Sequence, residues 1–173
     1  NYNPSFSAKG GSVIKGDKPG KVILVPKERK MSVTVVNSGA TLGTESFDVK
    51  QIPAPRYVAM DNNRRPIDLK NGVRGASLTG LRITAEAEEN FKQEVPQDAN
   101  YRIRSMEVIL ARGTQRVATL NANSEILDMG AWRSQFRPGD RLIIDIKSVT
   151  RRTFQGQDEK VPIRSEVINI PIQ

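Results

Sequence analysis

Apolar and polar side chains alternate along most of the chain, so that every second residue is apolar over several segments. The alternation is most regular in 141–149, where Leu142, Ile144 and Ile146 share one parity. A period of two places alternate side chains on one face of a β-strand, so each segment is predicted to be a strand with one solvated face. The segments with this pattern are 21–25, 31–36, 76–85, 101–110, 141–149 and 166–172.

Short clusters of Gly, Pro, Asn and Asp separate these segments. Such residues favour turns, and their close spacing is typical of antiparallel β-sandwiches. The segments 21–25 and 31–36 flank PKERK (26–30) and are expected to pair as a hairpin. In 124–136 a helix is conceivable, but Gly130 favours a loop or a short 3₁₀ piece. The predicted fold class is all-β.

The apolar alternation changes phase within 101–110. Tyr101 and Ile103 occupy odd positions, whereas the inward-facing residues predicted after Arg104–Ser105 are Met106, Val108 and Leu110, at even positions. A β-bulge at this place would return both sets to the inner face and bend the strand, so that it could serve two sheets.

The segment FDVKQIPAP (47–55) joins a strand pattern to two prolines. Phe47 and Val49 continue the apolar alternation, while Pro53 and Pro55 fix φ, remove two backbone donors and favour extended geometry in the residues before them. A proline-containing extended segment is stiffer than a Gly/Ser linker. We therefore predict that Pro53 and Pro55 form a hinge that sets the angle between two domains.

The basic residues change type at the same place. Residues 1–56 contain seven Lys and two Arg, whereas 57–173 contain four Lys and fourteen Arg. We predict two tandem β-sandwich domains, 1–55 and 56–173. The second is long enough for a complete sandwich of about 7 to 9 strands. A domain as small as the first buries only about 60% of its unfolded surface, so we expect it to be incomplete, either cut from upstream strands or completed by another chain.

The chain contains neither His nor Cys. This removes the commonest general base, the commonest metal ligand, the thiolate nucleophile and disulfides. A serine nucleophile would need a motif such as G-x-S-x-G, which the sequence lacks. The acidic residues in 86–98 lack the ligand spacing of a calcium loop and are expected to form a solvated loop. No catalytic, cofactor-binding or metal-binding residue is predicted, and an enzyme of unusual chemistry stays as an alternative.

No apolar run approaches the roughly 20 residues that a membrane-spanning helix needs. The chain begins NYNPSF, without Met and without a basic-then-apolar signal sequence. We expect it to be a fragment whose targeting or membrane segment lies upstream.

Three motifs follow one another along the chain: SFSAKGGSVIKG (5–16), F-x-V-K-x-I-P-x-P (47–55) and F-R-P-G-D-R-L (136–142). Their order and spacing resemble the C-terminal periplasmic part of the GldM/PorM family. The resemblance implies the end of the third periplasmic domain followed by the whole fourth, both Ig-like antiparallel sandwiches. It also implies a non-enzymatic component of the type IX secretion and gliding machinery.

Family members are anchored in the inner membrane by an N-terminal helix that contacts a motor protein. Their dimeric periplasmic domains reach outer-membrane-associated lipoprotein and ring partners. The resemblance therefore implies a periplasmic homodimer, an elongated strut that couples the motor to the ring. No cofactor, nucleic acid or small-molecule substrate is expected.

Two short segments are candidate partner interfaces. Trp132 lies beside Arg133 and Arg137, and the adjacent Arg151 and Arg152 precede a turn that resembles a hairpin tip. Arginine and aromatic residues are enriched at protein interfaces. A single Trp can equally be a core residue, and two arginines at a turn can simply be solvated.

The net charge of +8 also invites a nucleic-acid interpretation. Acidic residues are interspersed among the basic ones, however, and aromatic residues are only 5% of the chain, which leaves little for base stacking. A basic face that is solvated or meets an acidic protein is favoured. An extracellular or periplasmic glycan-binding or adhesion module, with Trp132 as its platform, is the alternative from another class.

Overall fold

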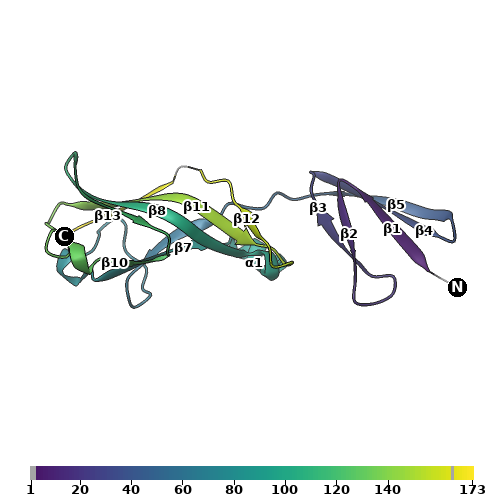
Figure 1. Ribbon diagram of the computed structural model, residues 1–173, viewed down its shortest axis with the longest axis horizontal. Coiled ribbons are helices and arrows are strands. Elements are labelled where there is room, and N and C mark those ends of the chain that lie inside the picture. The colour runs from purple at the N-terminus through teal and green to yellow at the C-terminus, as the bar shows by residue number, and fades with distance from the viewer. Residues whose placement is uncertain (1–2, 165) are drawn as a thin grey trace. The chain divides into compact units, whose positions relative to one another are not determined.

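The computed structural model of the protein describes residues 3–164 and 166–173 (Figure 1). The chain divides into two compact units, Asn1–Ile52 and Pro53–Gln173, called here the first and the second unit. Both units are built from antiparallel strands. The all-β class predicted from the alternating pattern is therefore confirmed.

The first unit contains two small sheets. Its strands are β1 (Pro4–Lys9), β2 (Gly11–Lys15), β3 (Val22–Pro26), β4 (Lys30–Asn37) and β5 (Ala40–Asp48). One sheet has the order β1-β4-β5, and the other is the β2-β3 hairpin. The predicted pairing of 21–25 with 31–36 is wrong, because β3 pairs antiparallel with β2 across the turn that joins them. The Gly16 amide donates to the Lys21 carbonyl at 2.8 Å and closes that turn.

Little apolar surface is buried inside the first unit. Met31 and Val33 are its buried apolar residues among those the structure describes. All nine residues of β5 are exposed, and Leu42 and Phe47 on this strand are 55% and 46% exposed.

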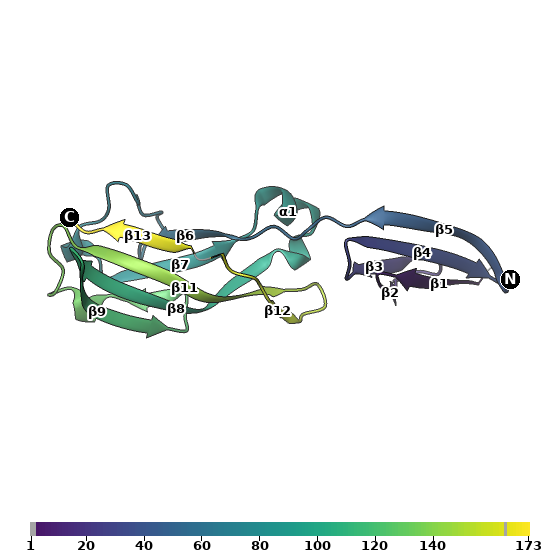
Figure 2. The same ribbon diagram turned by 90° about the horizontal axis from the view of Figure 1, so that it is seen from above.

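The second unit is a two-layer sandwich (Figure 2). One sheet has the order β10-β7-β6; the other has the order β12-β11-β8-β9, with β13 also paired to β11. The strands are β6 (Arg56–Met60), β7 (Gly80–Glu86), β8 (Asn100–Arg112), β9 (Gln115–Ala122), β10 (Ile126–Asp128), β11 (Arg141–Arg152), β12 (Asp158–Lys160) and β13 (Val167–Pro171).

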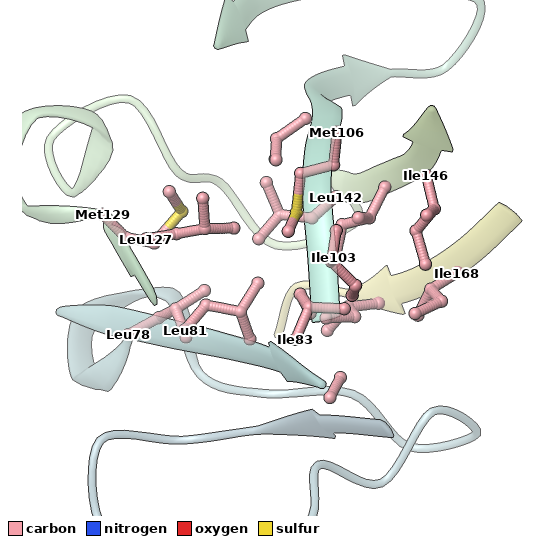
Figure 3. Close-up of a cluster of buried hydrophobic side chains, with 14 of the residues drawn as sticks. Leu78, Leu81, Ile83, Ile103, Met106, Leu127, Met129, Leu142, Ile146 and Ile168 are labelled. Atoms are coloured by element: carbon pink, nitrogen blue, oxygen red, sulfur yellow. The ribbon is translucent and has the colours of Figure 1, made fainter. Parts of the chain in front are cut away.

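The core of the second unit lies between its two sheets. Figure 3 shows Leu81 and Ile83 of β7 facing Ile103 and Met106 of β8. The register of β8 against β11 shifts on both sides of Ser105. The bulge predicted near Arg104–Ser105 is confirmed, because Ile103 and Met106 are both buried although their positions differ in parity.

Short helical pieces complete the second unit. They are α1 (Glu89–Glu94), η1 (Gly75–Ser77), η2 (Pro96–Asp98) and η3 (Gly130–Trp132), the last three being 3₁₀ turns. Glu88, Glu89 and Glu94 are exposed, as predicted for 86–98, but this segment is not a plain loop, because 89–94 form α1 and Phe91 packs against the core. Among the residues described, no helix is long and apolar enough to cross a membrane.

Candidate functional site

The two prolines of the predicted hinge are held by the second unit. The Tyr101 hydroxyl donates to the Pro53 carbonyl oxygen at 2.9 Å, and both Tyr101 and Pro55 are buried. Proline cannot donate a backbone hydrogen bond, so the carbonyl is the polar group by which Pro53 can be fixed. The segment from Pro53 onward is therefore part of the framework of the second unit.

Arg151 supports this anchor from inside the sandwich. It lies opposite Tyr101 in the β8–β11 ladder and is 6% exposed. Its guanidinium donates to the Asp98 carboxylate at 2.9 Å, to the Asp98 carbonyl at 3.1 Å and to Glu159 at 2.7 Å. Burial raises the pKa of Tyr101, and the positive charge of Arg151 acts in the opposite direction. Arg151 thus ties η2 and β12 to the strand that anchors Pro53.

A cavity of about 710 Å³ adjoins the anchor. Ala54 and Pro55 form one part of its wall, and residues 85–89, Lys92 of α1 and Glu166 form others. Arg56 and Glu86 make an ion pair of 2.7 Å at its rim. In the described part of the chain, no three Asp or Glu side chains form a group that could hold a metal ion.

The turn after η3 is held by a buried ion pair. Asp140 is 1% exposed and accepts two hydrogen bonds of 2.8 Å from the Arg112 guanidinium and one of 2.9 Å from the Arg137 amide. Arg112 also donates to the Gln135 carbonyl at 2.9 Å. The hydrogen bonds from Arg112, aided by the Arg137 amide, lower the pKa of Asp140, although burial acts in the opposite direction.

Trp132, Arg133 and Arg137 lie at this turn. Trp132 is half-buried and packs against the core of the sandwich. The Arg133 guanidinium donates to the Ala76 carbonyl at 2.9 Å, and the side chains of Arg133 and Arg137 are exposed.

The structure separates the five predicted interface residues into two groups. Trp132, Arg133 and Arg137 lie at the end of the second unit that contains η1, η3 and the C-terminus, called here the η3 end. Arg151 and Arg152 lie at the opposite end, which contains α1, β12 and Pro53 and is called here the α1 end (Figure 1). Adjacent positions on β11 place Arg151 inside and Arg152 outside, with the Arg152 Nε 3.4 Å from Asp158.

Sequence reasoning did not identify Tyr101, Arg112 or Asp140 as structural anchors. The alternation does place Tyr101 on the inner face, but its hydroxyl bonds a carbonyl 48 residues earlier. Arg112 and Asp140 are 28 residues apart, and nothing in the pattern around either residue indicates the other as its partner.

We expect Tyr101→Phe to lower the free energy of unfolding of the second unit by about 1 kcal/mol, because the partly buried Pro53 carbonyl loses its donor. Chemical denaturation measures the change. Tyr57→Phe is the matched control, since its ring is also partly buried, and it should change stability by less than about 0.5 kcal/mol. Equal effects of the two substitutions would show that the bond to Pro53 contributes nothing.

The fold and these contacts define a tandem β-sandwich protein with an anchored proline segment and exposed arginines. In comparison with protein families, the GldM C-terminal domain matches residues 53–173 and the GldM third domain matches residues 1–50. The chain belongs to the GldM family, and the resemblance noted from its motifs is confirmed. Among curated proteins the comparison found no match. Membership makes this chain a structural component of the type IX secretion and gliding machinery, in which the C-terminal GldM domains are periplasmic.

Proposed function

We propose that this chain is the outer part of an elongated, dimeric periplasmic strut, which couples an inner-membrane motor to outer-membrane-associated ring partners. The single observation that carries the mechanical part is the anchoring of Pro53 by Tyr101, together with the burial of Pro55. A joint fixed to the framework of one unit transmits displacement, whereas a solvated Gly/Ser linker would absorb it. The two packed antiparallel sheets of the second unit agree with an Ig-like sandwich.

The proposal can be tested in the cell that makes the protein. Full-length protein that carries Pro53→Gly and Pro55→Gly should accumulate normally, because the hydrophobic core cluster contains neither proline, yet secretion and gliding should fall. Ala54→Gly between the two prolines is the control for an added glycine. Secretion at the parental rate with both prolines replaced would refute the strut proposal.

The dimer is proposed from the open face of the first unit. An apolar groove of about 370 Å³ lies between its two sheets and is lined by Val22 and Leu24 of β3, Val33 of β4, and Leu42 and Phe47 of β5. A unit this small needs further apolar burial to be stable, and β5 also has a free edge for pairing. We propose that a second copy of the chain covers this face and completes the unit.

Light scattering coupled to size exclusion tests the dimer. The chain of 19.2 kDa should elute with twice that mass, and Leu42→Glu should shift it to the monomer by placing a charge in the groove. Ser46→Glu, on the same strand but outside the groove lining, should remain dimeric. A monomeric parent chain, or a dimer that survives Leu42→Glu, would contradict the proposal.

A further inference from the structure

The η3 end of the second unit carries a concentration of positive charge. Its cations come from the loop 61–74, the turn that contains η3, and the first residue of β11. The exposed ones, called here the basic end, are Arg64, Arg65, Lys70, Arg74, Arg133, Arg137 and Arg141.

Backbone contacts bring these segments together. The Val73 amide donates to the Pro171 carbonyl at 2.9 Å, and the Gly75 amide donates to the Gln173 carbonyl at 3.3 Å. Gly72 adopts φ +80°, and a Cβ there would lie 2.2 Å from the Pro171 carbonyl oxygen, so the loop is pressed against the end of β13. The basic end is thus displayed on a defined backbone.

The loop 61–66 joins the same end through its polar contacts. The Asn62 side chain donates to the Thr79 hydroxyl at 2.7 Å, and the Met129 amide donates to the Thr79 carbonyl at 3.0 Å. The Arg141 guanidinium reaches the Gly113 carbonyl at 3.2 Å, which adds the β8–β9 turn to this surface.

The carboxylates of this end are used internally. Asp61 accepts the amides of Asn63 and Arg65 at 2.8 and 2.9 Å. Asp68 accepts the Lys70 amide at 2.8 Å, the Asn71 amide at 2.9 Å and the Asn71 side chain at 2.6 Å, and these bonds lower its pKa.

The other two carboxylates of this end, Asp128 and Asp140, also accept hydrogen bonds from residues of the same end. Asp128 accepts the Gly130 amide at 2.8 Å, and Asp140 is occupied by Arg112 and the Arg137 amide. All four aspartates therefore stabilise turns, and among the residues described none makes a salt bridge to any of the seven exposed cations.

The excess of positive charge in residues 57–173 is located at the η3 end. With Arg112, the η3 end has eight cations against four carboxylates, an excess of four, whereas residues 57–173 as a whole carry a net charge of only +3. The remainder of this region is therefore close to neutral. A net positive charge at one end steers and orients a partner of the opposite sign.

The composition of this end fits a protein partner. Six of its seven exposed cations are Arg, whose planar guanidinium matches a carboxylate in two-pronged hydrogen bonds. Leu69 is 47% exposed beside Lys70, and Trp132 and Phe136 are only half-buried, which supplies the apolar contacts that protein interfaces combine with arginine. No row of exposed aromatic rings is present on the described surface for stacking with bases.

We propose that the basic end binds an acidic surface of a protein partner in the secretion machinery. This names the chemistry of the partner and rests on the strut function proposed above. The acidic surface presents Asp and Glu to the seven cations, and the attraction weakens with added salt.

Site-specific photocross-linking tests the inference. It is carried out in the complex that copurifies with the full-length protein. A benzophenone amino acid replaces Arg137 at the basic end or Arg102 at the α1 end, and the cross-linked peptides are sequenced. Arg64→Gln, Arg65→Gln and Arg74→Gln together remove three exposed cations of the basic end, whose side chains form no hydrogen bond or ion pair with the residues described. Lys92→Gln, Arg152→Gln and Lys160→Gln remove the same charge from the α1 end.

The expected result is a cross-link from position 137 to an Asp- and Glu-rich peptide of another protein. Its yield should fall at least about fivefold in the triple variant of the basic end and change less than about twofold in the triple variant of the α1 end. The inference is overturned by a peptide without an acidic excess, by a lipid or nucleic-acid adduct, by no adduct, or by equal losses in both triple variants. A complex that contains no other secretion component would instead refute the strut function.

Discussion

Replacing Asp140 by Ala should lower the free energy of unfolding of the second unit by about 2 to 3 kcal/mol. Asp140 is buried and accepts three hydrogen bonds, two of them from Arg112. The substitution removes the acceptor and leaves Arg112 and the Arg137 amide without it. The loss is smaller than for a fully buried pair, because the Arg112 side chain is 35% exposed and can recover water.

Denaturant unfolding at neutral pH measures this loss, and Asp145→Ala is the matched control. Asp145 also pairs with a neighbouring cation, Lys147, but on the outer face of β11 and with its side chain 28% exposed. The control should lose less than about 1 kcal/mol. Equal losses would show that the Arg112–Asp140 pair does not determine the stability of the η3 end.

The same pair predicts how stability depends on pH. Arg112 and the Arg137 amide lower the pKa of Asp140 in the folded protein below its usual value of 3.8. A group whose pKa is lowered by folding stabilises the folded state above its unfolded pKa and loses that contribution as pH falls through the folded pKa. The difference between the parent and Asp140→Ala should therefore be fully present at neutral pH and shrink below about pH 4. A difference that is constant from pH 7 to pH 2 would contradict this assignment.

Much of the strand arrangement could be predicted from the sequence because side-chain parity determines which face is buried. The parity change in 101–110 even located the bulge beside Ser105. The pairing of strands was less predictable, because alternation does not show which two strands are neighbours. β3 pairs antiparallel with β2 and not with β4. The helix α1 was not predictable from periodicity, because Phe91 is its single apolar residue.

Contacts between distant residues explain the remaining errors at the candidate sites. Pro53 and Pro55 could be identified from the sequence because proline restricts the φ angle of its own residue and has no backbone donor. The partner of Pro53 could not be inferred, because the Tyr101 hydroxyl reaches it across 48 positions. Parity alone would not have predicted the burial of Arg151, because the apolar positions Leu142, Ile144 and Ile146 are even. Arg151 faces inward because the register of β11 shifts between Ile146 and Val149.

The basic end also depends on contacts between residues that are far apart in the sequence. Arg133 and Arg137 were selected from one segment, whereas Arg64, Arg65 and Arg74 join them only through the folded loop 61–74. Positive charge is in excess because eight cations gather against four aspartates, and these aspartates cap turns instead of pairing with the exposed cations, which is visible only in the structure.

Replacing Pro53 and Pro55 by Gly should have the largest effect on the joint. Both φ angles become free, and glycine at these positions converts a stiff extended segment into a flexible one. The Tyr101 hydroxyl can still bond the carbonyl of residue 53, so the second unit should keep its stability to within about 1 kcal/mol. The change should therefore affect the mobility of the joint and not the folding of either unit.

Electron spin resonance distance measurement across the joint tests the central claim most directly. The chain has no Cys, so Thr41→Cys on β5 and Thr119→Cys on β9 give two unique labelling sites, and excess unlabelled chain suppresses distances within a dimer. The parent should give a narrow distance distribution, and Pro53→Gly with Pro55→Gly should broaden it roughly twofold or more. A distribution that is already broad in the parent, or equally narrow in the variant, would contradict the proposal that the proline joint holds the angle.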